Sequence, residues 1–568
     1  MYVLSIQSKS QNADKNNKNE VAHNLYLKDL KYLSPEVLGL NEKEGANNLG
    51  LFAKLWFREV VKGLKQFLYE GSLHGVKYVF EPSFSAKERI IWVIIIVISI
   101  IMCAMNIIQL ISKWTSTPFV NVIDSLPTPI WAIPFPTVVL CPHVHIKLSY
   151  KNMSQLNELE LFFASFVCPY MFGQNRSTQD SLTADENIKF QEFIVKGSLK
   201  CKEVVKHCHW RAKQLINTEW QTSDCCEKFF KPVFTEYGLC FAFNNLPLGG
   251  MTNSTQEWQK TFNDNASGAL LEWGLDNGYP TIFPPVTGSV PYRVMASGEA
   301  NGVDLELYLN ISEHQYTCDG HYRGFNLLIR SPTDHVYSTT ILRLPMDKMT
   351  TIEVTPTTYK TDMSLRSLSP DLRQCFFQNE RKLEYFEFYT DSNCQHDLLI
   401  RETKKECKCV MYNWPRKSIK DPVCSTNDDF LCTKKVKAVV EKRRIYAYYK
   451  DRDEQRKHRE YSSSCYPSCN DVLYSSQVYY SDLGERPAPH WDEPKRGERT
   501  LLNVHFYNEM FLGQHRHAQY DDYYFAGAIG GLFSLFLGFS IISLAEIVYF
   551  VLLKPVYVAL IETFFKVN

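Results

Sequence analysis

Ile90-Ile-Trp-Val-Ile-Ile-Ile-Val-Ile-Ser-Ile-Ile-Met102 begins a stretch of 23 residues without a charged side chain, which ends at Ser112. Arg89 and Lys113 flank this stretch. A helix of that length rises roughly 35 Å at about 1.5 Å per residue, enough to cross a hydrocarbon core of about 30 Å. The stretch begins too late and is too long for the apolar part of a cleaved signal peptide. We therefore predict a membrane-spanning helix at 90–112.

A second stretch, 523–553, carries a single charge, Glu546, and predicts the second span. It is unusually rich in small residues, and Gly527 with Gly531 has the small-xxx-small spacing that lets membrane helices approach closely. A carboxylate at membrane depth costs about 2.5–3.5 kcal/mol on insertion scales, so Glu546 is expected to face a bundle interior or an aqueous path. A glycine-rich dimerisation helix is the alternative. The small residues are Gly527, Gly530, Gly531, Gly538, Ser534, Ser540 and Ser543.

Cysteines and glycosylation sequons indicate the side of the membrane on which the middle of the chain lies. Sixteen of the 17 cysteines lie between Cys141 and Cys469, which indicates an oxidising compartment. The segment 1–89 holds 13 Lys and Arg, as the positive-inside rule expects of a cytoplasmic flank. We expect 1–89 and 554–568 to be cytoplasmic and 113–522 extracellular. The sequons begin at Asn152, Asn175, Asn253, Asn265 and Asn310.

The expected extracellular segment mixes strand and helix patterns. Residues 154–235 combine helical periodicity with loops, and the cytoplasmic stretch 51–69 has apolar residues at helical spacing, either along the membrane face or in an ordinary soluble helix. The fold class is therefore a membrane protein with two transmembrane helices and a large, disulfide-rich, mixed α/β extracellular domain. Strands are expected at 137–140, 303–309, 325–329, 340–344, 351–354 and 500–506.

Five motifs in order resemble the degenerin/epithelial sodium channel/acid-sensing channel superfamily, most closely its insect pickpocket branch. The resemblance covers the chain from about His74 to Leu553. The motifs are His74-Gly75, Phe135-Pro-Thr-Val-Val-Leu-Cys141, Tyr237-Gly-Leu-Cys-Phe-Ala-Phe-Asn244, Leu365-Arg-Ser-Leu-Ser-Pro-Asp-Leu-Arg-Gln-Cys375, and the second span from Ile529-Gly-Gly to Glu546-Ile-Val-Tyr-Phe.

The resemblance implies a trimeric channel in the plasma membrane, a homotrimer or a heterotrimer with related subunits. Such a channel conducts sodium ions, is amiloride-sensitive and voltage-insensitive, and is gated through its ectodomain. Gly538, Phe539 and Ser540 correspond to the selectivity tract. Gly527 corresponds to the outer-pore position where bulky residues hold family channels open, and Ala528 replaces an acid found in some relatives. His74 and Gly75, with Gly530, Gly531 and Glu546, are the remaining expected pore and gating residues.

The resemblance also implies five disulfides. One further disulfide of the family is missing here, since Leu398 and Ser463 stand at the two positions where the family normally has cysteines. Of the six remaining cysteines, Cys208 is expected to pair with Cys225 or Cys226, and Cys168 with Cys201, with Cys318 left over. The implied pairs are Cys141–Cys240, Cys375–Cys469, Cys394–Cys465, Cys407–Cys432 and Cys409–Cys424.

No motif indicates an enzyme, a cofactor, a metal site or a nucleic-acid interface. The cysteines lack the Cys-x-x-Cys spacing of zinc modules, and the net charge is zero. Histidine pairs at 143/145 and 515/517 are interpreted as solvated strand or loop residues. Acids at 451, 453 and 454 lie where relatives carry proton- or ligand-linked carboxylates but are interpreted as a solvated helical face, because Arg452, Arg456 and Lys457 adjoin them.

Two alternative functions remain open. An ATP-gated trimeric channel shares two spans and a cysteine-rich ectodomain, but it requires a basic triphosphate site and lacks the Gly-x-Ser tract. A non-conducting or modulatory receptor tethered by both spans would share every feature except the composition of 523–553.

Overall fold

The computed structural model describes residues 42–116, 119–168, 171, 184–210, 220–221, 225–246, 248–253, 273–280, 291–335, 341–418, 421–449, 465–484, 497–519 and 521–567. The chain divides into a helical unit, Met1–Thr117 with Tyr520–Asn568, and a sheet unit, Pro118–Gln519. Among the predicted residues, Asn175, Asn265, Ser463 and the acids at 451, 453 and 454 lie outside the described part of the chain.

The helical unit contains two helices that are long and apolar enough to cross a membrane, Ala86–Ser116 and Ile541–Glu562. The first contains the predicted span 90–112. The second predicted span, 523–553, is divided between two helices, because the first stops at Leu537 and the next starts at Ile541 and continues past the predicted end. The helices are α2 (Glu42–Glu70), α3 (Val76–Phe80), α4 (Ala86–Ser116), α17 (Asp522–Leu537), α18 (Ile541–Ile547), the π-helical turn η7 (Val548–Leu553) and α19 (Lys554–Val567).

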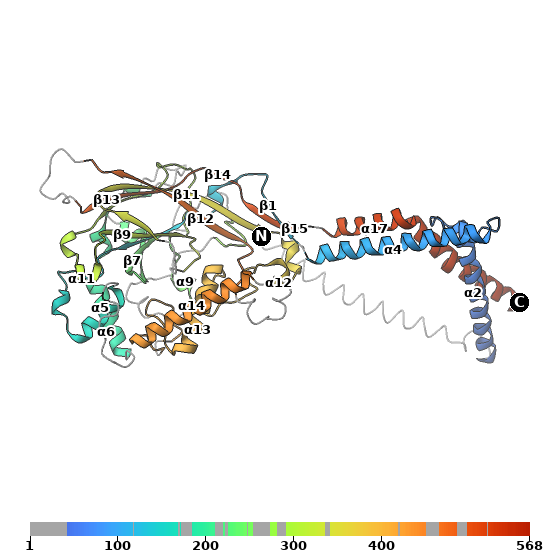
Figure 1. Ribbon diagram of the computed structural model, residues 1–568, viewed down its shortest axis with the longest axis horizontal. Coiled ribbons are helices and arrows are strands. Elements are labelled where there is room, and N and C mark those ends of the chain that lie inside the picture. The colour runs from blue at the N-terminus through green and yellow to red at the C-terminus, as the bar shows by residue number, and fades with distance from the viewer. Residues whose placement is uncertain are drawn as a thin grey trace, which may run out of the picture. The chain divides into compact units, whose positions relative to one another are not determined.

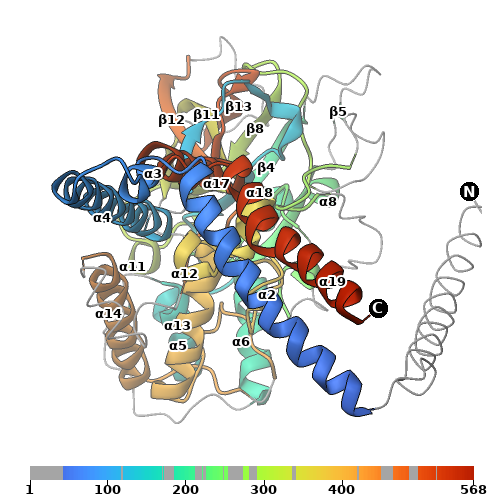
Figure 2. The ribbon, with the colours of Figure 1, turned by 90° about the vertical axis from the view of Figure 1, so that its right-hand side faces the viewer.

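Helix α2 contains the expected helical stretch 51–69 and lies beside α19 (Figure 2). Gly63 allows it to approach η7, since a Cβ at this position would come within 1.9 Å of the Phe550 carbonyl oxygen. The Lys554 ammonium donates to Gln66 Oε1 at 2.7 Å, and an exposed ion pair joins Arg58 to Glu562 at 2.9 Å. These contacts attach α2 to the chain that follows the second apolar segment.

Two sheets form the framework of the sheet unit. The larger has the order β1-β15-β11-β13-β8-β4-β5, with β12 on β11, and the smaller has the order β10-β9-β3-β7-β6. Pro356 of β11 falls between the residues that pair with β13 and those that pair with β15, where a missing N–H disturbs neither ladder. All six predicted strands are confirmed: β3 (Thr137–Pro142), β8 (Gly302–Tyr308), β9 (Gly324–Arg330), β10 (Leu342–Pro345), β11 (Lys348–Thr361) and β13 (Arg499–Phe506).

Several strands were not predicted. The longest is β12, which pairs with β11 over 12 residues but buries few apolar side chains. Others fall in the region expected to mix helix and loop. The unpredicted strands are β1 (Phe119–Ile123), β2 (Thr128–Pro129), β4 (Val205–Trp210), β5 (Trp220–Gln221), β6 (Phe230–Thr235), β7 (Gly238–Phe243), β12 (Asp471–Asp482), β14 (Met510–Phe511) and β15 (Gln514–Ala518).

Two of the sequence motifs become neighbouring strands, because β3 and β7 pair antiparallel and both are fully buried. The disulfide Cys141–Cys240 joins them. Asn244, at the end of its motif, has a positive φ of 54° and donates through its side-chain amide to the Phe135 carbonyl at 2.5 Å. Its side-chain oxygen accepts the Tyr292 N–H at 2.6 Å. Asn tolerates the left-handed region, and its amide cross-links the two motifs.

Helices of the sheet unit gather on one side of the strands in Figure 1, where α13 (Asp391–Cys407) and α14 (Asn427–Tyr449) lie side by side. They enclose a second core around Tyr385, Phe386 and Trp414. Leu398, at one position of the missing disulfide, packs against this core. The other helices include α5 (Glu158–Val167), α6 (Ala184–Gly197), α7 (Cys201–Val204), α8 (Cys225–Lys228), α9 (Leu248–Met251), α11 (Tyr316–Asp319) and α12 (Pro370–Arg373).

Eight disulfides pair all the cysteines except Cys103. Five of them join the pairs that the resemblance implied. The prediction of Cys168–Cys201 is wrong: the structure has Cys168–Cys318, Cys201–Cys226 and Cys208–Cys225. Consecutive residues on a helix point about 100° apart, so the adjacent cysteines of α8 reach different partners. Cys168 pairs with a residue 150 positions away, which spacing along the chain could not indicate.

Candidate functional site

The helix break within the second apolar stretch begins at Gly538. This residue has φ 64°, a left-handed conformation that ends α17, and its N–H donates to the Ser534 carbonyl at 2.9 Å. Glycine adopts this conformation without the penalty that a Cβ imposes, which is why it is common just after a helix. The glycine of the Gly-Phe-Ser tract is thus the residue that stops the helix.

Ser540 starts the next helix. Its hydroxyl accepts the N–H of Ser543 at 3.2 Å, while the Ser543 hydroxyl accepts the N–H of Ser540 at 3.1 Å. This reciprocal capping satisfies two of the N–H groups that the first turn of any helix leaves free. Gly538 and Ser540 therefore have complementary roles, one ending a helix and the other beginning the next.

The segment 71–75 packs directly against this break. The His74 N–H donates to the carbonyl of Leu537, the last residue of α17, at 3.1 Å. The His74 ring lies so close to Gly538 that a Cβ there would approach its Cγ to 2.4 Å. The structure thus brings together the His-Gly motif and the Gly-Phe-Ser tract, whose predicted roles were assigned separately.

Ser72 extends this contact to the predicted intramembrane acid. Its backbone N–H donates to Glu546 Oε2 at 3.0 Å, and its hydroxyl lies 2.5 Å from the Ser543 hydroxyl. Glu546 therefore has a hydrogen-bond partner from another segment, as expected of an acid at membrane depth. Sequence reasoning missed Ser72 and gave Ser543 no role beyond its small size, because their partners lie more than 470 residues away along the chain.

Gly75 joins this segment to α3 with φ 79°. Its Cα faces the ring of Trp92 on α4, which would be 3.5 Å from a Cβ. Tyr78 of α3 stacks on Trp92 with a centroid distance of 4.5 Å. The segment 71–75 is thereby anchored to the first apolar helix as well as to the break.

The first half of the second stretch has an open face. Helices α17 and α4 lie side by side (Figure 1). Trp114 stacks on Phe525 with ring centroids 4.9 Å apart. A Cβ at Gly527, Gly530 or Gly531 would have no heavy atom within 4 Å among the described residues. Ala528, the residue after Gly527, is partly buried. These three glycines are thus exposed in the single chain.

Three predicted sequons lie in the described residues. Asn152 and Asn310 accept, through their side-chain oxygens, the N–H of the serine two positions on, at 3.0 Å each. Asn253 is exposed, and its amide nitrogen donates to the Phe386 carbonyl at 3.1 Å. Glycosylation at these positions stays a prediction.

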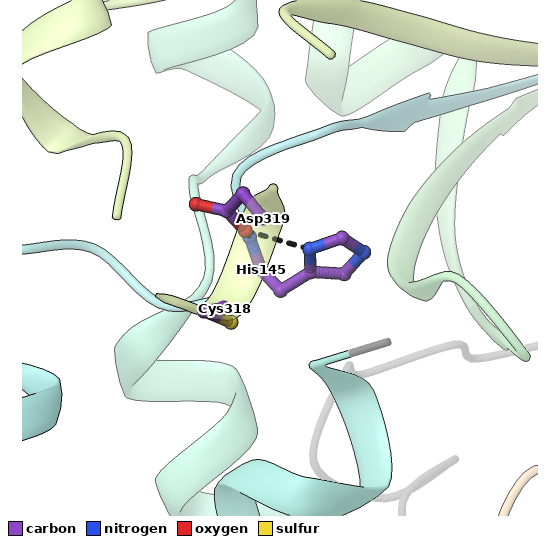
Figure 3. A group of neighbouring side chains, drawn as sticks. All are labelled: His145, Cys318 and Asp319. Carbon is purple, nitrogen blue, oxygen red and sulfur yellow. Dashed lines mark hydrogen bonds and ion pairs between the residues drawn. The ribbon is translucent and has the colours of Figure 1, made fainter. Parts of the chain in front are cut away.

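The interpretation of His143 and His145 as solvated is wrong, because both are buried in the sheet unit. The carboxylate of fully buried Asp319 accepts the N–H and the Nδ1–H of His145 at 2.9 and 2.7 Å. Figure 3 shows this pair beside Cys318. The three could hold a metal by proximity, but the Cys318 sulfur is in a disulfide and both Asp319 oxygens have donors. The cluster is therefore structural.

The burial of His143 predicts that the sheet unit loses stability in acid. Its Nε2–H donates to the Asp319 carbonyl at 2.8 Å, its Nδ1 is buried without a partner among the described residues, and burial lowers its pKa to about 4. A pKa below the usual 6.5 contributes stability above pH 6.5 that is lost as the pH falls toward 4. We expect His143→Gln, which keeps a donor but cannot titrate, to remove at most about 3 kcal/mol of this loss.

The measurement is the melting temperature of the purified protein between pH 7 and pH 4.5. Other buried groups titrate in the same range, including Asp471, whose pKa burial raises to about 7. The variant and the wild type are therefore compared by the slope of melting temperature against pH. Equal slopes would contradict the assignment to His143.

Comparisons with known proteins identify the family of the chain. The family described as "Amiloride-sensitive sodium channel" matches residues 67–550. Pickpocket protein 28 of Drosophila melanogaster is 22% identical over 517 residues, covering 87% of this chain and 79% of the relative. Sodium channel protein Nach of the same species is 21% identical over 502 residues (85% and 86%), and the human bile acid-sensitive ion channel is 21% identical over 508 residues (85% and 84%). The resemblance to the degenerin and pickpocket proteins is confirmed, and the chain belongs to the amiloride-sensitive sodium channel family.

Proposed function

We propose that this chain is a subunit of a sodium-selective channel whose pore is lined by the second apolar segment, with Gly538, Phe539 and Ser540 at its narrowest part. The observation that carries the proposal is the helix break at this tract. A break exposes backbone polar groups, which at membrane depth is tolerated only where protein or a water-filled path satisfies them. Carbonyls and small side chains around a narrow path can replace part of the hydration shell of an ion.

The contacts of segment 71–75 support a gating role for this segment. It binds the break through Leu537 and binds Glu546 through Ser72, so a movement of the segment changes both partners at once. The break itself is capped by Gly538 and Ser540, and Ser543, the partner of Ser540 in that cap, also contacts Ser72 of the segment. We propose that the segment holds the tract in one of two arrangements.

The finer features of the channel belong to the same proposal. The exposed glycines of α17 leave a surface that can approach other subunits closely, consistent with a homotrimer or heterotrimer. The cytoplasmic termini, the plasma-membrane location, amiloride block and gating through the ectodomain are proposed by family resemblance.

Gly527→Val tests the proposal in oocytes. A bulky side chain on the open face of α17 is expected to hold the pore open and to give a standing inward current, which should vanish when external sodium is replaced by a large organic cation. Gly250→Val, in the sheet unit where a Cβ also meets nothing within 4 Å, is the matched control and should give no standing current. Surface biotinylation normalises the currents.

Ser540→Cys supplies the second arm, tested in the Gly527→Val background. Since Cys103 is the only unpaired cysteine, a Cys103→Ala background leaves the new thiol as the sole target of a thiol reagent. Block of the current by the reagent supports a pore lined by this tract. Surface protein without current, even with related subunits coexpressed, would favour the non-conducting receptor instead.

A further inference from the structure

A histidine and aspartate cluster lies on one face of the large sheet. His515 and His517 are alternate residues of β15, so their side chains leave the strand on the same side. Strand β11 pairs Lys360 with His515, which brings Asp362, two residues further on, beside His517 on that face. The Asp362 N–H donates to the Arg516 carbonyl at 2.9 Å and fixes this position.

The side chains of this cluster already converge. His515 Nε2 lies 2.8 Å from Asp362 Oδ1, and one ligand atom from each of Asp362, His515 and His517 lies within 4.8 Å of the others. Among the residues that the structure describes, neither ring nitrogen of His517 has a hydrogen-bond partner. The cluster therefore has nitrogen atoms available to bind a metal. By contrast, both oxygens of the buried Asp319 already accept hydrogen bonds.

Asp124 lies behind His515. Its Oδ1 is 3.6 Å from His515 Nδ1, the nitrogen that faces away from Asp362. Glycine at residue 513 leaves room for this carboxylate, since a Cβ there would come within 2.7 Å of Asp124 Oδ2. A carboxylate behind a metal-binding histidine commonly fixes the ring orientation and raises the basicity of the ligand nitrogen.

We propose that Asp362, His515 and His517 bind a divalent transition-metal cation, with zinc as the best fit. Two imidazoles and one carboxylate form a common zinc ligand set that leaves a fourth position for water. Bonds of about 2.0–2.2 Å in a tetrahedron place ligand atoms about 3.4 Å apart, so side-chain rotation has to close only about 1.5 Å. Asp362 and His515 are 44 and 31% exposed, which gives a cation access from solvent.

Two basic residues, Lys360 and Arg516, adjoin the site along the paired strands. Lys360 is opposite His515 on the same face, but it is exposed, and its flexible side chain can keep the ammonium in water while the stem lies along the sheet. Arg516 leaves β15 on the other side, where it lies over the Phe119 ring and donates to the Asn121 side chain. The basic neighbours therefore do not occupy the ligand positions.

Metal binding at this site would tie β11 to β15, which ends four residues before α17 begins. Strand β1, which supplies the flank of the site, begins three residues after α4 ends. An effect of zinc on current rests on the proposed channel function, whereas binding itself does not.

The test is zinc binding by the purified full-length chain in detergent, measured by competition with a fluorescent chelator. We expect His517→Ala and Asp362→Asn each to weaken zinc binding at least about tenfold, and Asp124→Asn to weaken it by about tenfold. His207→Ala, an exposed histidine on β4 outside the cluster, is the matched control and should bind like wild type.

Melting temperatures measured in EDTA show whether each variant is folded, and His517→Gln provides a milder second change at the same position. Equal zinc affinity in wild type and in folded His517→Ala and Asp362→Asn would overturn the site, as would loss of binding in His207→Ala to the same extent. Because the readout is binding rather than current, failure of this site is distinguishable from failure of the proposed channel.

Discussion

Gly538→Ala is expected to reduce the sodium current per surface channel at least about tenfold. The left-handed backbone of this residue costs a non-glycine residue about 1–2 kcal/mol, and about 1.4 kcal/mol corresponds to a tenfold change in an equilibrium. In addition, the new Cβ would lie 2.4 Å from the His74 ring, which then has to move. Displacing His74 would also strain its backbone hydrogen bond to Leu537. The measurement is whole-cell current in the Gly527→Val background, normalised to surface protein.

A double mutant separates the backbone penalty at residue 538 from the clash with the His74 ring. His74→Ala removes the ring that a Cβ at residue 538 would meet but leaves the backbone penalty in place. Gly538→Ala combined with His74→Ala is therefore expected to lose less current than the two single changes predict together. Gly250→Ala is the matched control outside the helical unit. If Gly538→Ala carried wild-type current, neither the break nor its contact with His74 would matter for conduction.

The two apolar segments, the strands with regular alternation and five disulfide pairs could be predicted from the sequence. Each depends on a local pattern or on the resemblance. Strand β12 was not predicted, because most of its side chains are exposed and its apolar residues lie on both of its faces. Its long pairing with β11 depends instead on backbone hydrogen bonds, for which almost any side chain is suitable.

The individual residues of the candidate site were predicted from the sequence, but the contacts between them were not. Gly538 and Ser540 were expected to line a path, yet their roles as the end of one helix and the start of the next follow from φ and from hydrogen bonds. The contact of His74 with the break joins segments more than 450 residues apart, and no local pattern reports such a distance. Likewise, His143 and His145 look solvated in the sequence, although both are buried and bonded to Asp319, 176 and 174 residues away along the chain.

Asp319→Ala is expected to destabilise the sheet unit by roughly 3–5 kcal/mol, enough to prevent most of the protein from reaching the cell surface. The substitution leaves the N–H groups of His145 and Gln315 and the His145 ring nitrogen buried without an acceptor. Each such unsatisfied group costs about 1–3 kcal/mol. Asp319→Asn should cost less, because its oxygen can still accept from His145, although its NH₂ group then faces the Gln315 N–H.

Surface biotinylation and thermal unfolding of the purified chain measure the effect of Asp319→Ala. Asp428→Ala, at an exposed acid in the first turn of α14, is the control and is expected to change stability by no more than about 1 kcal/mol. The order Asp319→Ala, Asp319→Asn, Asp428→Ala, from most to least damaging, follows from the number of buried donors left without an acceptor. Equal surface levels for Asp319→Ala and Asp428→Ala would mean that the buried histidine network does not hold the segment after β3 against α11.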